Sequence, residues 1–177
     1  MATLTLATVT RDQPNTDLDG IFRQHYQLIY RTAFGLTGRS EDAEDVLQTI
    51  FLRLLGREFP PDLITNPRAY FYRAAVNVSL NVIRSRKGQV QIVDADALAA
   101  VDESESEGAD ETQKRLLNAI SQLNTGAVEI VMLRYVHDYS DAQIAKMLGT
   151  TRGTVAVSLY RSRARIKKLM RGSGENL

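Results

Sequence analysis

The sequence predicts an all-α protein: two small helical domains joined by a flexible acidic linker. Three observations support this fold class. Apolar residues recur at spacings of three and four along most of the chain, as on one face of a helix. Residues 94–111 interrupt that pattern with eight acidic side chains and no basic one. Residues 139–170 have the cap, turn and apolar spacing of two helices joined by a tight turn. A length of 177 residues suits two domains of this size.

We expect a flexible N-terminal tail over residues 1–17 and a first domain over residues 18–87. Its first helix has an apolar stripe of Phe22, Tyr26, Ile29, Tyr30 and Ala33, and Gly35 and Gly38 loosen its end. Ser40 is expected to cap a second helix, whose acidic first turn suits the helix dipole. The predicted buried stripe of this helix is Ala43, Val46, Leu47, Ile50, Phe51, Leu54 and Leu55.

A loop is expected over residues 56–65, before Asn66 and Pro67 open a third helix. This helix should bury Phe71, Ala74, Ala75, Val78 and Val82. Residues 88–110 are too polar to pack and are predicted to be a linker. The second domain is predicted over residues 111–171, followed by a tail over residues 172–177.

The second domain ends in a predicted helix-turn-helix. Ser140 can cap its first helix, and Gly149 can end that helix in a left-handed turn. Thr151 can then cap a second helix that faces the core with Val155, Leu159 and Ile166. In a helix-turn-helix the second helix lies in the DNA major groove.

Composition excludes several classes of function. The chain has no cysteine, which excludes disulfides and thiolate catalysis and fits a reducing cytoplasm. No apolar run approaches the roughly 20 residues of a membrane span, and the N-terminus does not resemble a signal peptide. His25 and His137 have no neighbouring ligands at metal spacing. No phosphate loop or nucleophile motif occurs, so we expect no enzyme activity, catalytic residue, cofactor or metal.

The helix after Thr151 is strongly basic. Seven basic residues and no acidic one lie between residues 152 and 171, which suits phosphate contact. Side chains in the first turn of such a helix reach base edges, and later cations reach phosphates. The alternative is a helical hairpin with a solvated basic face. The candidate duplex-binding residues are Thr151, Arg152, Thr154, Val157, Ser158, Arg161, Arg163 and Arg165.

The third helix has an expected outward face that suits single-stranded nucleic acid. Aromatic side chains stack on bases, amides read base edges and cations hold phosphates. The alternative is a face that is merely solvated. The candidate strand-binding residues are Tyr70, Arg73, Asn77, Asn81 and Arg84, with Arg86 and Lys87 extending the basic end.

The second helix has an expected outward face of acidic, polar and apolar side chains. Such a face could dock on the basic surface of a partner protein, or it could be solvated. The candidate docking residues are Asp42, Asp45, Gln48, Thr49 and Leu52.

Three motifs in this order resemble the bacterial sigma factors of the extracytoplasmic-function group. SEDAEDVLQTIFLRLL, residues 40–55, is similar to the family's polymerase-binding helix, with Asp45 and Gln48 at contact positions. NPRAYFYRAAVNVSLNVIRSRKG, residues 66–88, is similar to the helix that recognises and melts the promoter −10 element. IAKMLGTTRGTV, residues 144–155, matches the helix-turn-helix that reads the −35 element. The resemblance implies core RNA polymerase and promoter DNA as partners. It also makes an anti-sigma protein a candidate partner, since family members commonly have one.

The chain departs from the family pattern at several positions. Tyr70 replaces the usual tryptophan, Asn81 an aspartate and Asn124 a proline. Ala156 and Ser158 stand where the family tends to place lysine and arginine, so we expect weaker phosphate binding. Two alternatives to a sigma factor stay open. One is a stand-alone DNA-binding regulator, and the other is an interaction protein that sequesters a transcription partner.

Overall fold

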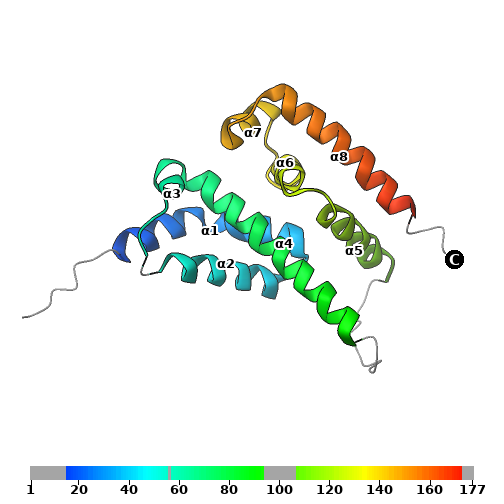
Figure 1. Ribbon diagram of the computed structural model, residues 1–177, viewed down its shortest axis with the longest axis horizontal. Coiled ribbons are helices and arrows are strands. Elements are labelled where there is room, and N and C mark those ends of the chain that lie inside the picture. Colours follow the sequence, from blue (N-terminus) through cyan, green and yellow to red (C-terminus); the bar gives the residue numbers. More distant parts are fainter. Residues whose placement is uncertain (1–14, 56, 94–106, 173–177) are drawn as a thin grey trace, which may run out of the picture.

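Eight helices make up the part of the chain that the computed structural model describes, residues 15–55, 57–93 and 107–172. They are α1 (Asn15–Thr37), α2 (Ser40–Leu54), α3 (Pro61–Thr65), α4 (Pro67–Val93), α5 (Glu107–Ser121), α6 (Thr125–Tyr135), α7 (Asp141–Leu148) and α8 (Arg152–Gly172). These ranges contain no strand, which confirms the all-α prediction. Figure 1 shows α1–α4 on one side and α5–α8 on the other. We call these groups the N-terminal unit and the C-terminal unit.

The N-terminal unit is held together by an apolar cluster between α1, α2 and α4. Most of the stripe predicted for α2 is buried in it. From α4 the cluster takes Phe71, Ala75 and Val78, and the ring of Phe22 meets that of Phe71 edge-on at 5.8 Å. Each large apolar side chain buried in this way stabilises the fold by about 1.5–3 kcal/mol.

Three local predictions in the N-terminal unit were wrong. Ser40 does not cap α2: the N-cap residue is Arg39, in extended conformation and without a side-chain cap bond. The predicted loop contains α3, because Pro61 takes the first helical position, where its missing N–H costs nothing. Leu55 is 39% exposed rather than buried, since the chain has already left the helix there.

The C-terminal unit is built around α6. This helix lies between α4 and α8 (Figure 1), and six of its eleven residues are buried. A helix that is covered on several sides must be apolar on several sides, as this one is. Asn124 is its N-cap, and its side chain accepts a 2.9 Å hydrogen bond from the N–H of Ala127. Asn124 therefore starts the helix through a cap bond at the position where the family usually has proline.

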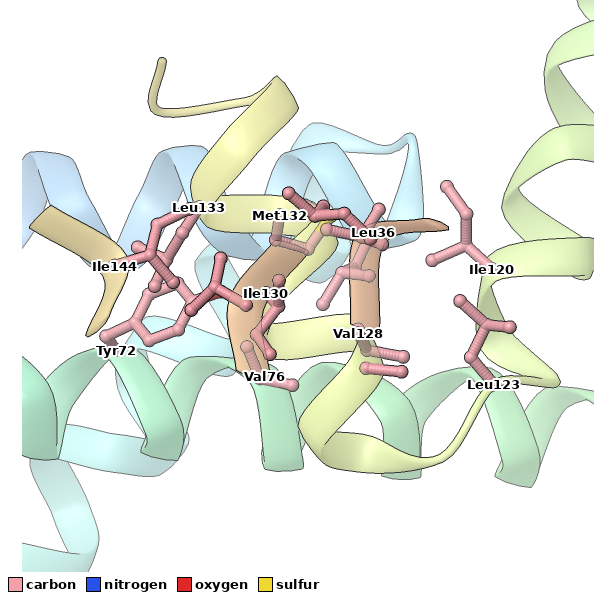
Figure 2. Packing of buried hydrophobic residues seen from close by; sticks show 14 of the residues in the cluster. Leu36, Tyr72, Val76, Ile120, Leu123, Val128, Ile130, Met132, Leu133 and Ile144 are labelled. Carbon is pink, nitrogen blue, oxygen red and sulfur yellow. The ribbon is translucent and has the colours of Figure 1, made fainter. Parts of the chain in front are cut away.

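The two units share a second apolar cluster. Leu36 of α1 and Tyr72, Val76 and Leu80 of α4 pack with residues of α5, α6, α7 and α8. Figure 2 shows side chains from both units converging in this cluster. We call this contact the seam. Because of the seam, α4 buries two faces, one in each cluster.

The predicted linker is flanked by longer helices than expected. α4 continues past Lys87 to Val93, and α5 begins at Glu107. Extending an existing helix by a few residues costs little compared with starting one. Residues 94–106 of the predicted linker lie outside the described residues, as do residues 1–14 and 173–177 of the predicted tails. The predicted domain boundaries therefore stay a prediction.

Candidate functional site

The predicted helix-turn-helix is present in α7 and α8. Ser140 caps α7 in a capping box, in which its side chain and that of Gln143 each bond the other residue's backbone N–H. Gly149 ends α7 with φ of 69°, a left-handed conformation that suits glycine. Thr151 then accepts a 3.1 Å hydrogen bond from the N–H of Thr154 and caps α8.

The inner face of α8 sets which side chains point outward. Val155 and Leu159 are buried in the seam cluster, and Ile166 packs against it. Arg115 of α5 donates a 2.6 Å hydrogen bond to the carbonyl of Met170 and ties down the other end of α8. α8 is thus held at both ends, and its opposite face is left for contacts outside the chain.

A groove of about 840 Å³ runs between the outward side of α8 and the turn that joins α5 to α6. It brings together five of the predicted duplex-binding residues, Thr154, Val157, Ser158, Arg161 and Arg165. Gln122 and Asn124 line the opposite wall, and neither was predicted as a site residue. Both lie before α6, and no feature of the sequence near them indicated that they face α8. The groove has two cations and no carboxylate among its lining residues.

Three predicted duplex-binding residues lie outside the groove. Arg152 is exposed in the first turn of α8, and the Thr151 hydroxyl is occupied as a cap. Arg163 faces Tyr135: its Nε donates to the tyrosine hydroxyl at 2.5 Å, and its guanidinium lies 5.8 Å from the ring centroid. Arg163 is therefore directed away from the cations in the groove.

The outward face predicted for α4 is only partly free. Asn77 and Asn81 are exposed, and Arg84 is exposed beside Asn81, with a 3.5 Å contact between Nη1 and Oδ1. Tyr70 is half-buried and meets the ring of Phe71 edge-on at 5.7 Å. The structure describes the backbone but not the side chain of Lys87.

Arg73 and Arg86 from this predicted face are engaged within the chain. Arg73 is half-buried and donates a 3.1 Å hydrogen bond to the carbonyl of Leu148, at the end of α7. Arg86 forms an ion pair with Asp42 of α2. Arg86 was predicted to extend the basic end of the strand-binding face; its charge is neutralised by Asp42, and its contact with DNA stays a prediction.

Asp42 was also predicted wrongly, as a residue of the outward face of α2. It is 5% exposed and points toward α4, where Arg86 pairs with it. A signal was present in the sequence: Asp42 precedes Val46 and Ile50 at a spacing of four, and both of these are buried. A carboxylate at that register lies on the buried side unless the helix bends.

The remaining predicted docking residues divide into exposed and half-buried. Asp45 and Gln48 are exposed and Leu52 is 63% exposed, while Thr49 is half-buried. Gln48 also lines a small groove between α1 and α2, together with the aromatic residues Phe22, Tyr26 and Phe51. Docking on α2 would therefore also reach α1.

An exposed aromatic ridge on α1 was not predicted from the sequence. Tyr26, which belongs to the apolar stripe predicted for this helix, is 41% exposed, and Phe34 is 44% exposed. The rings of Tyr26, Tyr30 and Phe34 stack in succession, with centroids 6.1 and 6.2 Å apart. The signal was their common spacing of four, which puts three aromatic rings on one side of the helix.

His137 lies in the seam and has a strongly perturbed pKa. Its Nε2 is 2.8 Å from the hydroxyl of Thr32. Burial, and then the positive charges of Arg31 and Arg68, lower the pKa of His137 from 6.5 to about 4, against the opposing charge of Asp138. Among the described residues no group of histidine and acidic side chains could hold a metal ion, and no helix is apolar enough to cross a membrane.

Comparison with known proteins identifies the family. Residues 21–89 match the family described as Sigma-70 region 2, and residues 113–166 match Sigma-70, region 4. The RNA polymerase sigma-E factor of Streptomyces antibioticus is 30% identical over 155 residues, which cover 86% of this chain and 83% of that protein. The ECF RNA polymerase sigma factor SigL of Mycobacterium tuberculosis is 29% identical over 143 residues, 79% of this chain and 81% of its own length.

The chain therefore belongs to the sigma-70 family, in the extracytoplasmic-function (ECF) group of RNA polymerase sigma factors. A solved structure of CnrH in complex with the cytosolic domain of CnrY is similar with a TM-score of 0.52 and 19% identity, covering 89% of each chain. At that identity the likeness shows the fold alone.

Proposed function

We propose that this protein is a transcription initiation factor that binds core RNA polymerase and directs it to specific promoters. The observation that carries the proposal is the presence of both sigma regions in order, the second with a groove that contains two outward cations of α8, Arg161 and Arg165. RNA synthesis belongs to the polymerase, and we expect no catalytic activity in this chain. The proposed place of action is the cytoplasm.

The C-terminal unit is proposed to read the −35 duplex. Arg152 and Thr154 stand in the first turn of α8, from which side chains reach base edges in the major groove. Arg161 and Arg165 line the groove further along and suit phosphate contact. Val157 is exposed and lies between Thr154 and Arg161 along α8, where it suits apolar contact with thymine methyl groups.

The N-terminal unit is proposed to capture the single strand of the −10 element on α4. The exposed amides of Asn77 and Asn81 suit base edges, and the guanidinium of Arg84 suits the backbone. Tyr70 supports stacking through the part of its ring that remains accessible, and Arg73 adds a second cation. Arg86 is left out of this proposal, because its guanidinium pairs with Asp42 of α2.

Core polymerase is proposed to dock on the exposed side of α2, through Asp45, Gln48 and Leu52. An anti-sigma protein is a further proposed partner, as membership of the ECF group implies.

Pull-down of core polymerase, followed by sequencing of the transcripts that the complex initiates, tests this function.

Asp45→Arg combined with Gln48→Ala should weaken core binding at least about tenfold and leave the fold intact, because both side chains are exposed. Glu58→Arg, an exposed charge reversal outside α2, is the matched control. Core binding equal to that of the control would mean that α2 is not the docking surface. Duplex binding without any core binding would favour the stand-alone regulator.

A further inference from the structure

A polar pocket lies apart from the surfaces proposed for polymerase and DNA. Its volume of about 620 Å³ is in the range of small-molecule sites. Its walls come from α1, from the turn between α3 and α4, and from the segment between α6 and α7, so both units contribute to it. No aspartate or glutamate is among its described lining residues, which include Gln24, Gln27, Arg31, Asn66, Arg68 and His137. We call it the seam pocket.

Both arginines of the seam pocket are held in place and still have free donors. Nη2 of Arg31 donates to the carbonyl of Val136 at 2.7 Å, which leaves the N–H groups of Nη1 and Nε for a ligand. The guanidinium of Arg68 lies over the ring of Tyr139, 5.3 Å from its centroid, and this contact takes up no N–H group. Within the described residues neither arginine forms an ion pair with a carboxylate. Two such guanidinium groups on one pocket suit a phosphate, whose oxygens match their planar fork of donors.

The positive charge of the pocket acts on His137, which also lines it. Burial is the largest cause that lowers the pKa of His137, and the charges of Arg31 and Arg68 come next, against the opposing charge of Asp138. The imidazole is therefore neutral at pH 7, and the two guanidinium charges are left without a compensating anion in the pocket. A phosphate between the arginines would supply that anion.

The seam pocket lies on a different side of α4 from the amides proposed to bind the DNA strand. Arg68 and Asn77 are nine positions apart, which is about two and a half turns of an α-helix. They therefore stand on opposite sides of α4, and Arg68 is directed toward Tyr139 of the C-terminal unit. This separation favours a free small molecule over the DNA backbone as the source of the phosphate.

We propose that the seam pocket binds a small molecule that carries a phosphate group. The phosphate lies between Arg31 and Arg68 and accepts N–H bonds from both guanidinium groups. The pocket is larger than a phosphate alone requires, and its remaining space is lined by amides. Gln24 and Gln27 are exposed and offer both donors and acceptors, which suits a polar group such as the base of a nucleotide.

Isothermal titration calorimetry on the full-length chain at low salt tests the site. The probes are inorganic phosphate and the nucleoside monophosphates AMP, GMP, CMP and UMP, with the four uncharged nucleosides as ligand controls. At least one nucleotide should bind more tightly than inorganic phosphate and than its own nucleoside. Arg68→Gln should weaken that binding about tenfold, the value of one charge-assisted hydrogen bond, and should keep the fold because Arg68 is exposed. Arg57→Gln, which removes an exposed arginine outside the pocket, is the matched control and should leave the affinity unchanged.

The pKa of His137, followed by NMR, gives a second measurement at the same site. A bound phosphate cancels part of the positive field of Arg31 and Arg68, so saturation with the nucleotide should raise this pKa from about 4. A ligand bound elsewhere, for example on the basic face of α8, would leave it where it is.

Three results would overturn the proposal. The first is that none of the phosphate probes binds at millimolar concentration. The second is equal nucleotide affinity in Arg68→Gln and Arg57→Gln, or an unchanged pKa of His137 at saturation, since either result would put the ligand outside the pocket. The third concerns a fluorescent single-stranded DNA pool of random sequence: if the DNA displaces the nucleotide and loses affinity in Arg68→Gln, the pocket takes a backbone phosphate and no small molecule. Strand affinity that is unchanged by saturating nucleotide and by Arg68→Gln supports a separate small-molecule site.

Discussion

Removal of the Arg86 guanidinium should destabilise the fold more than removal of its partner Asp42. The side chain of Asp42 is 6% exposed and that of Arg86 is 40% exposed. In Arg86→Ala the carboxylate stays buried, and among the described residues its Oδ2 already has no hydrogen-bond partner. A buried charge stripped of its partner costs about 3 kcal/mol, the low end of the usual range because Arg86 is near solvent. For a chain of this length that corresponds to a fall in Tm of about 6–12 °C.

Asp42→Ala should cost less, about 1 kcal/mol or about 2–4 °C, because the freed guanidinium can turn to water. Thermal unfolding followed by circular dichroism measures both changes. Arg84→Ala is the matched control, since Arg84 is exposed two residues earlier on α4. A Tm for Arg86→Ala equal to that of wild type, with a loss of strand affinity as large as that of Arg84→Ala, would refute the pairing argument. Arg86 would then be the DNA contact that the sequence predicted.

Three further outcomes are expected. Burial lowers the pKa of His137 from 6.5 to about 4, so the folded protein favours the neutral imidazole. The stability that this gives is fully present above pH 6.5 and is lost as the pH falls toward 4. His137→Gln should therefore make Tm depend less on pH between pH 6.5 and 4. Gly149→Ala should lower the Tm by about 2–4 °C through strain at positive φ, whereas Gly153→Ala in helical α8 should not, by the same melting assay. Arg161→Ala should reduce duplex affinity and its salt dependence more than Arg163→Ala in titrations at two salt concentrations; equal losses would contradict the groove as the DNA site.

Local signals made the helix-turn-helix predictable from sequence. Ser140, Gly149 and Thr151 each act within a few residues of themselves, through a cap bond or a left-handed turn. The apolar spacing of Val155 and Leu159 also depends only on the geometry of one helix. Such features do not need knowledge of distant partners, and all of them are confirmed.

Features that depend on contacts between distant segments were missed. The pair of Asp42 and Arg86 joins residues 44 positions apart, and the sequence around either residue does not indicate its partner. Each was predicted to face outward because charged side chains usually do. The seam was not predicted for the same reason. Tyr72, Val76 and Leu80 recur at a spacing of four, but the local sequence does not indicate which helix covers that side of α4.

The arrangement of α4 explains why its sequence is apolar on two sides and polar on a third. Phe71 belongs to the first cluster and Tyr72 to the seam, so successive residues serve different contacts. The next residue, Arg73, lies at the border between the seam and the exposed amides. A helix with 3.6 residues per turn cannot separate three such faces widely, so a side chain at the border is shared. Arg73 occupies that border: its Nη2 bonds the carbonyl of Leu148 on the seam side, while Asn77 on the next turn of α4 is exposed.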